Sequence, residues 1–246
     1  MSMNKEVVIL LHGFCGTSEG WSETARSLAK DFEVLTPDWP GFGSRGADAP
    51  LESIEQMADH VVQIADRAGI ARFHLVGHSM SGFVVQHLLL EHPHRVGRAV
   101  LYGTFAAMED GGRFETVMET VAKLNHDGLE PTVNRIVTSW FIDGAAHSKH
   151  ARCIEQGLSM SLSAARAAMI ACDGVDFRGR LANIRAPVLV ILGEKDRTVR
   201  LDAAIALARG VDAGCLCVLP RAAHAAHLEQ QELFNLAVRR FLLAAS

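Results

Sequence analysis

The chain has 246 residues, and its 49% hydrophobic content is enough to bury a full core as one domain spanning residues 1–246. Its 24 basic and 28 acidic residues give a formal net charge of -4, and no run of Lys or Arg forms the basic stripe that nucleic-acid binding usually requires. We therefore expect no nucleic-acid partner.

Targeting and membrane signals are absent from the sequence pattern. The first apolar run, Val7–Leu11, ends at His12 before the hydrophobic region of a signal peptide would be complete. Elsewhere Glu, Arg, His or Asp interrupts each apolar stretch before it reaches membrane-spanning length. The sequence predicts a cytoplasmic protein without a membrane span.

The cysteines indicate neither a disulfide framework nor a zinc site, because their number is odd and no C-x-x-C pair occurs. They are Cys15, Cys153, Cys172, Cys215 and Cys217. Cys215 and Cys217 flank one residue of a strand-like run, so their side chains share a face. We expect both to pack in the core.

Short apolar runs alternate with helix-like segments along most of the chain. The predicted strands are residues 7–11, 34–36, 73–76, 99–102, 188–192 and 215–219. The predicted helices are residues 18–30, 54–68, 81–91, 202–208 and 232–243. Because the strands are continuously apolar, helices should cover both sheet faces, and the fold class is α/β with a mostly parallel central sheet of about six strands.

Residues 104–183 break this alternation. Helix-like stretches at 114–124, 132–140 and 163–172 follow one another there without a convincing strand between them. Pro187 then marks the return to the sheet, since proline is tolerated at the start of a strand. The sequence predicts a helical cap inserted in the single domain.

The clearest chemical signal lies where the strand beginning at Phe73 ends at Ser79 and a helix follows at once, as in a nucleophile elbow. So sharp a turn exposes the serine Oγ and requires small neighbours, and Gly77 is one of them. Ser81 occupies the place of the second glycine of G-x-S-x-G, with Gly82 after it. Serine is small enough to keep the turn, so we predict Ser79 as the nucleophile.

A second element of the predicted site follows the first strand, at His12–Gly16. A developing oxyanion needs two fixed N–H groups, and we predict those of Phe14 and Met80. Cys15 is an alternative to Phe14 as donor and is predicted to border the substrate pocket.

Asp196 lies just beyond the strand 188–192, at the carboxyl end where catalytic groups of parallel sheets collect. There it is expected to accept a hydrogen bond from a histidine Nδ1–H and to orient the ring. Glu194 is the nearest alternative carboxylate, and Glu109 and Asp110 are more distant ones.

Two histidines, His224 and His227, follow the last predicted strand, and either is a candidate base. The order Ser79, Asp196, His224 along the chain is the order expected for a serine hydrolase built on a parallel α/β sheet.

Taken together, these segments resemble the α/β-hydrolase fold family, from His12 through the D-x-P-G-x-G-like loop at 38–43 to the last helix. The catalytic histidine of that family is usually followed by Glu five positions on and by an aromatic residue in the last helix. His224, Glu229 and Phe234 match this pattern, although Ala223 replaces the usual Gly. The resemblance therefore selects His224 over His227.

The resemblance also implies an activity. Trp140 and the segment 167–181 are similar to the cap of 3-oxoadipate enol-lactonases and small esterases, which implies that Trp140 lines the pocket and that a cap arginine pairs with a substrate carboxylate. The expected function is hydrolysis of a small-molecule ester or lactone through a Ser-His-Asp triad and an acyl-enzyme, with no metal and no cofactor.

Other functions are compatible with the same motifs. Hydrolysis of carbon-carbon bonds or thioesters, and perhydrolysis, use the same triad. The departures at Ser81 and Ala223 keep open a protein that binds a ligand on a hydrolase scaffold without turnover, and an exposed apolar cap would suit an interaction module.

Overall fold

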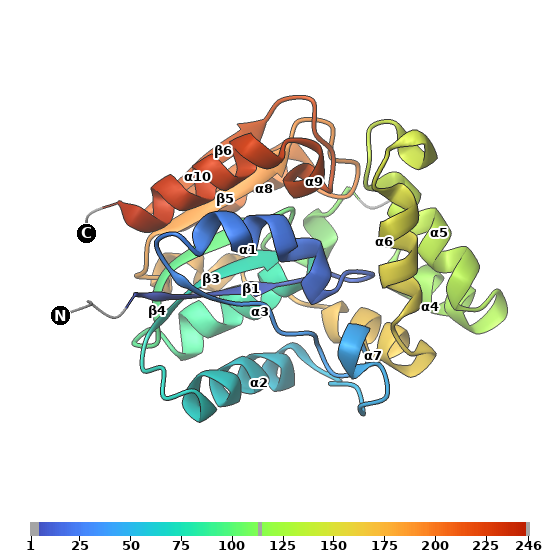
Figure 1. Ribbon diagram of the computed structural model, residues 1–246, viewed down its shortest axis with the longest axis horizontal. Helices are drawn as coiled ribbons and strands as arrows, with labels where there is room; N and C mark the ends of the chain where they lie inside the picture. The colour runs from blue at the N-terminus through green and yellow to red at the C-terminus, as the bar shows by residue number, and fades with distance from the viewer. Residues whose placement is uncertain (1–4, 113–114, 245–246) are drawn as a thin grey trace.

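The computed structural model describes residues 5–112 and 115–244, so Phe114, where one cap helix is predicted to begin, lies outside the described residues. Its centre is a six-stranded sheet in the order β2-β1-β3-β4-β5-β6, and every neighbouring pair is parallel (Figure 1). The strands are β1 (Val7–Leu11), β2 (Glu33–Leu35), β3 (Phe73–His78), β4 (Val96–Tyr102), β5 (Val188–Gly193) and β6 (Gly214–Leu219). The predicted fold class is confirmed.

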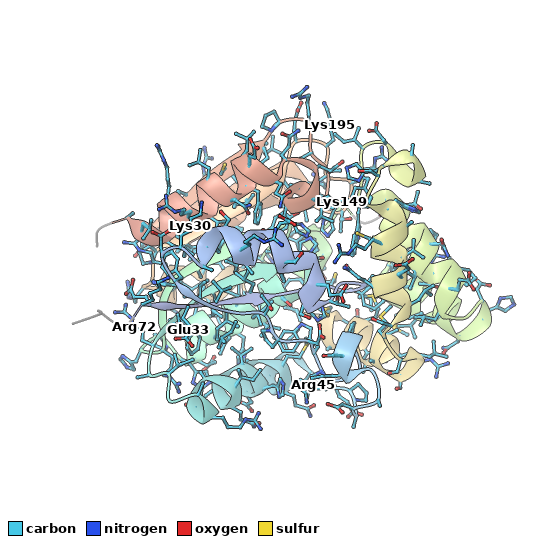
Figure 2. All side chains as sticks on the ribbon, in the orientation of Figure 1. Lys30, Glu33, Arg45, Arg72, Lys149 and Lys195 are labelled. Carbon is cyan, nitrogen blue, oxygen red and sulfur yellow. The ribbon has the colours of Figure 1, made fainter. Side chains whose placement is uncertain are left out.

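Helices cover both faces of this sheet, as the apolar strands require. Successive side chains of a strand point to opposite faces, and Val8 and Leu10 accordingly lie in one core cluster while Ile9 lies in the other. The first face is covered by α1 (Ser22–Leu28) and α10 (Gln231–Leu243), and the second by α2 (Ile54–Arg67), α3 (Met80–Glu91) and α8 (Leu201–Gly210) (Figure 1). Labelled charged side chains such as Arg72 and Lys195 lie at the periphery (Figure 2).

Between β4 and β5 the chain forms helices beyond one end of the sheet (Figure 1). They are α4 (Val117–His126), α5 (Leu129–Ser139), α6 (His150–Leu158) and α7 (Leu162–Cys172), with the short 3₁₀ helices η3 (Met108–Asp110), η4 (Gly144–Ala146) and η5 (Arg178–Asn183). Three of the four α-helices match predicted segments, and α6 was not predicted. The buried face of α6 consists of Cys153, Gln156 and Gly157, which give little apolar periodicity.

The prediction for the two C-terminal cysteines is wrong. β6 is an edge strand, paired only with β5 in the described sheet, and Cys215 is exposed while Cys217 is half-buried. An edge strand leaves part of its apolar residues uncovered, a property that its own sequence does not reveal. No helix in the described ranges is long and apolar enough to cross a membrane.

Candidate active site

Ser79 connects β3 to α3 in a backbone conformation that L-residues rarely adopt, with φ 53° and ψ -116°. Such strain typically costs about 1–3 kcal/mol and persists only where the surroundings enforce it. Here the Ser79 N–H donates to Tyr102 O (2.8 Å), and the Gly82 N–H donates to Ser79 O (2.8 Å). The Ser79 side chain makes no capping hydrogen bond to α3, so its Oγ is not committed to the helix.

Close packing explains the small residues around the elbow. A Cβ on Gly77 would lie 2.6 Å from Ser81 O, so glycine is required there. A Cβ on Gly82 would lie 2.5 Å from Thr104 Oγ1, so glycine is also required at this position, one residue later than in G-x-S-x-G.

Ser81, the departure from the motif, is fully buried and hydrogen-bonded. Its hydroxyl donates to His12 O, and the Trp39 indole N–H points at both His12 O (3.1 Å) and Ser81 Oγ (3.2 Å). One hydroxyl therefore ties the first turn of α3 to the end of β1.

The loop after β1 packs directly on the elbow. A Cβ on Gly13 would lie 3.0 Å from the Ser79 Cβ. His12 Nε2 accepts the Trp39 backbone N–H (3.2 Å), so its proton is on Nδ1, which donates to Gly13 O (2.9 Å). Burial lowers the pKa of His12, in keeping with a neutral ring that holds the loop.

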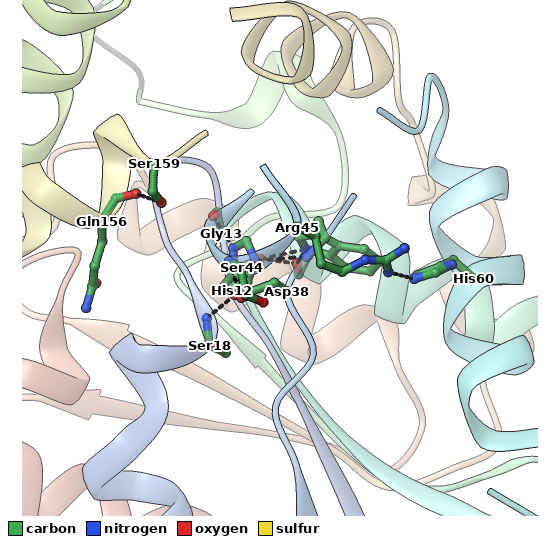
Figure 3. Close-up of polar contacts among 11 residues, drawn as sticks. His12, Gly13, Ser18, Asp38, Ser44, Arg45, His60, Gln156 and Ser159 are labelled. Atoms are coloured by element: carbon green, nitrogen blue, oxygen red, sulfur yellow. Dashed lines mark hydrogen bonds and ion pairs between the residues drawn. The ribbon is translucent and has the colours of Figure 1, made fainter. Parts of the chain in front are cut away.

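Asp38 anchors the glycine-rich loop beside His12 (Figure 3). Its carboxylate accepts the backbone N–H groups of Ser18 (2.6 Å) and Ser44 (2.9 Å) and the Ser44 hydroxyl (2.7 Å). Burial alone would raise the pKa of Asp38, but these hydrogen bonds outweigh it and lower the pKa. Gly43 has φ 52°, and a Cβ there would lie 2.6 Å from Asp38 Oδ2, so the loop needs glycine at this position.

His224 and Asp196 form a buried pair at the ends of β6 and β5. His224 Nδ1 lies 2.8 Å from Asp196 Oδ2, and the two side chains are 2% and 0% exposed. Asp196 Oδ1 accepts the backbone N–H groups of Thr198 (2.7 Å) and Val199 (3.0 Å). A carboxylate only accepts, so the His224 proton is on Nδ1 and Nε2 carries the free lone pair.

The structure does not bring the alternative carboxylates to His224. Glu194 is exposed, pairs with Lys195 (3.0 Å) at the molecular periphery and accepts the Arg221 N–H (Figure 2). Glu109 and Asp110 both contact Arg178 instead.

His224 lies against the elbow through contacts on two sides. A Cβ on Gly103, the residue after β4, would lie 3.2 Å from His224 Cε1. The His224 ring centroid is 4.8 Å from that of His78, the residue before Ser79.

A buried hydrogen-bond network that the sequence did not reveal fixes the backbone of His224. Its carbonyl accepts the Tyr102 O–H (2.6 Å) and lies 3.1 Å from His78 Nε2. Because the Tyr102 proton is used there, its oxygen accepts from His227 N–H (3.2 Å) and from His227 Nδ1–H (3.0 Å). Tyr102 is the only tyrosine of the chain, but no motif marks it.

We expect this network to make the free energy of unfolding depend on pH through His227. Burial lowers the pKa of His227 to about 3, whereas an unfolded histidine has a pKa of 6.5. Between these values the unfolded state binds one more proton, so the free energy of unfolding falls as the pH falls, by about 1.4 kcal/mol per pH unit for this residue.

His227→Gln, which retains an N–H donor toward Tyr102, should remove the contribution of His227 to this pH dependence. Between roughly pH 7 and pH 5 we expect the free energy of unfolding of the variant to fall by about 2 kcal/mol less than that of the wild type. Urea unfolding at the two pH values measures both losses, and equal losses would contradict the assignment of His227 as a neutral buried base.

One cavity brings Ser79 together with the two predicted oxyanion residues. It is lined by Phe14, Ser79, Met80, Phe83, Gly103, Thr104, Phe105, Met108, Met169, Cys172 and Thr198. Met80 is the first residue of α3, so its N–H has no acceptor within the helix.

The predicted contacts of Trp140 and Cys15 with this cavity are not found, because neither residue lines it. The Trp140 ring packs 6.3 Å from that of His224, and its carbonyl accepts the Ala225 N–H (3.0 Å). Cys15 is fully buried with φ 62°.

The predicted pairing of a cap arginine with substrate has no counterpart among the residues that the structure describes, since none of the arginines in residues 5–112 and 115–244 lines the cavity beside Ser79. Arg178 pairs with Asp176 (2.6 Å) and Arg180 with Glu91 (2.6 Å).

Glu229, which was identified by its spacing of five positions after His224 in the sequence, connects the loop that carries His224 to the cap helices. Its carboxylate accepts the N–H groups of Ala223 (2.6 Å) and Ile142 (2.8 Å). The loop that carries His224 is therefore fixed from both the sheet side and the cap side.

Comparisons with known proteins agree with this architecture. The model of the alpha/beta hydrolase fold family matches residues 6–167. A Rhizobium rhizogenes protein named for carbamate hydrolysis is 30% identical over 98% of this chain and 94% of its own length. A 2-hydroxy-6-oxo-6-phenylhexa-2,4-dienoate hydrolase of Burkholderia cepacia is also 30% identical, over 96% of this chain and 87% of its own.

Among solved structures, the enol-lactonase of Burkholderia xenovorans superposes with a TM-score of 0.90 at 24% identity, covering 98% of this chain and 93% of the other. The family match, the full-length relatives and the parallel sheet lead to one conclusion. The chain belongs to the α/β-hydrolase fold family.

Proposed function

We propose that the protein hydrolyses a carboxylic ester or lactone of a small molecule, with Ser79 as nucleophile, His224 as base and Asp196 as the carboxylate that orients the base. The observation that carries the proposal is the buried His224–Asp196 pair, 2.8 Å apart, at the sheet end that also holds the strained Ser79. A binding protein has no need of a histidine whose tautomer is fixed in this way.

Each proposed step follows from whether the group involved accepts a proton or donates a hydrogen bond. His224 Nε2 takes the proton of Ser79 Oγ as that oxygen attacks the substrate carbonyl, and Asp196 stabilises the imidazolium that forms. The N–H groups of Phe14 and Met80 stabilise the oxyanion. His224 then returns the proton to the leaving alcohol, and water releases the acyl group by the reverse sequence.

Carbamate hydrolysis is the second candidate. Two relatives, 30% and 28% identical over 98% and 97% of this chain, carry names for that activity. A carbamate differs from an ester only in bearing nitrogen on the carbonyl carbon, so the same nucleophile and oxyanion donors would act on it. Hydrolysis of a carbon-carbon bond is the activity of the Burkholderia cepacia relative, which is 30% identical over 96% of this chain, and it would use the same triad.

Labelling with a fluorophosphonate tests the proposal most directly. We expect one adduct per chain by intact mass, mapped to Ser79, and no adduct in Ser79→Ala or His224→Ala. Absence of labelling in folded wild-type protein would instead favour a ligand-binding protein on a hydrolase scaffold.

Ser81→Ala tests whether the departure from the motif helps catalysis. Without its hydroxyl, the loop that carries Phe14 loses one of its ties to α3, while His12 O keeps the Trp39 indole N–H. We expect kcat to fall roughly tenfold with KM unchanged, because the oxyanion donors act mainly in the transition state. The exposed Ser148→Ala is the matched control, and an unchanged kcat for Ser81→Ala would show that the tie is not needed for turnover.

A further inference from the structure

The cavity beside Ser79 is too small to hold a whole substrate. Its volume is about 20 Å³, close to the space that a single water molecule needs. Among the described residues that line it, only Ser79 and Met108 are half-buried, and the others are buried. A substrate that approaches from solvent therefore meets Met108 on its way to the nucleophile.

A larger hollow lies next to this cavity, and we call it the outer hollow. Its volume is about 550 Å³, and it is lined by residues of the segments 107–111, 115–119 and 173–176. Met108 lines both the cavity and the outer hollow. The hollow at the opposite side of Asp196, which Asp143 also lines, shares none of its described lining residues with the cavity.

Two chain segments extend from the cavity to the outer hollow. The segment 103–109 lines the cavity with its first residues and the outer hollow with its last ones. The segment 169–176 does the same, because Met169 and Cys172 line the cavity and the residues after them line the outer hollow. The two spaces therefore have continuous walls on two sides.

Hydrogen bonds fix the backbone of both segments where the two spaces meet. An antiparallel bridge joins Ala107 to Asp176. The Met108 N–H donates to Val175 O (2.9 Å). With the backbone held in this way, side chains determine how wide the passage between the two spaces is.

Met108 is the side chain in this wall that has room to move. The Phe105 ring packs 5.5 Å from that of Phe83, and a Cβ on Gly111 would lie 2.7 Å from Phe105 Cζ. Met169 is only 2% exposed. Met108, by contrast, is half-buried, and an unbranched methionine side chain with three rotatable bonds changes rotamer readily.

From these observations we propose that substrate reaches Ser79 through the outer hollow and that Met108 determines the width of the passage between the two spaces. This inference rests on the proposed function, because it assigns the access route to the same nucleophile. The part of the substrate that does not fit in the cavity lies in the outer hollow while Ser79 attacks the carbonyl carbon. Met108 is thus a specificity-determining residue, which favours substrates that are narrow next to the carbonyl.

Two sulfonyl fluorides of different width test the route. Methanesulfonyl fluoride and phenylmethanesulfonyl fluoride each transfer a sulfonyl group to an activated serine and release fluoride, and they differ by one phenyl ring. We expect Met108→Ala to raise the second-order rate constant for the phenyl reagent by roughly tenfold and that for the methyl reagent by less than about threefold. Met108→Trp should lower the rate constant for the phenyl reagent by roughly tenfold.

Two further methionines separate the width of the passage from other effects. Met118, which is 58% exposed on α4, lines neither space, so Met118→Ala should keep both rate constants. Met169 lines the cavity but not the outer hollow, so Met169→Ala enlarges the cavity without widening the passage. The phenyl reagent should gain less from Met169→Ala than from Met108→Ala, and an equal gain would overturn the assignment of Met108.

Asp173→Trp tests the outer hollow at a residue that does not line the cavity. Asp173 is exposed and lines the outer hollow, so a bulky ring there should slow the phenyl reagent, whereas Asp59→Trp, at an exposed position of α2, should not. Unchanged rates in Met108→Trp or in Asp173→Trp would show that the reagent enters elsewhere. Thermal unfolding of each variant establishes that the rates belong to folded protein.

The same experiment distinguishes failure of the route from failure of the proposed function. If neither reagent modified Ser79 in folded wild-type protein, the proposed function would be contradicted and the route with it. Adducts mapped to Ser79 whose rates of formation ignore Met108 would contradict the route alone.

Discussion

Ser79→Ala is expected to lower kcat for ester hydrolysis by roughly 10⁶-fold, because the variant has no atom that can form the acyl-enzyme. The oxyanion donors and the binding cavity remain, so a small rate above the uncatalysed reaction persists. Alanine at φ 53° carries the same backbone strain as serine, and the Ser79 side chain makes no cap hydrogen bond to α3. We therefore expect Tm to stay close to that of the wild type.

The double variant Ser79→Ala with His224→Ala strengthens this test. Residues that act as one unit are not additive, so removing both should cost no more than removing Ser79 alone. Initial rates of ester hydrolysis, with thermal unfolding measured on the same samples, give the activity and the Tm of each variant. Activity above about one hundredth of wild type in well-folded Ser79→Ala would exclude Ser79 as the nucleophile.

The sheet was predictable because its signal is local. Val7–Leu11 and Val188–Leu192 are continuous apolar runs of strand length separated by amphipathic segments, which only a sheet covered on both faces accommodates. Cys215 was misplaced because exposure at a sheet edge depends on strand order, which no single strand encodes.

The candidate site was predictable to the extent that backbone geometry restricts residue type. Ser79 and Gly77 occur at a turn where few residues fit, and Asp196 follows a strand at the edge where such groups collect. Tyr102 escaped detection because what distinguishes it is its hydrogen-bond partner, the carbonyl of His224, which is distant in sequence. Trp140 was assigned to the pocket by resemblance, yet its side chain packs against the base loop.

Asp196→Asn should lower kcat by about 10⁴-fold, and the hydrogen bonds around this carboxylate explain why. Asp196 Oδ1 accepts two backbone N–H groups, from Thr198 and Val199, so the oxygen of an asparagine side chain would take that position. Its NH₂ group would then face His224 Nδ1. A donor there obliges Nδ1 to accept, which moves the imidazole proton to Nε2, the nitrogen that must receive the proton of Ser79.

The wrong tautomer of His224 also predicts which other quantities change in Asp196→Asn. The KM of this variant should change little, because the effect lies on proton transfer. Its Tm should fall only modestly, because the backbone N–H groups of Thr198 and Val199 keep an acceptor. Glu194→Gln, at the alternative carboxylate that pairs with Lys195, should retain wild-type kcat. An inactive Glu194→Gln together with an active Asp196→Asn would show that Asp196 is not the carboxylate that orients His224. The 2.8 Å contact between Asp196 Oδ2 and His224 Nδ1 leads us to expect that Asp196→Asn is the inactive variant.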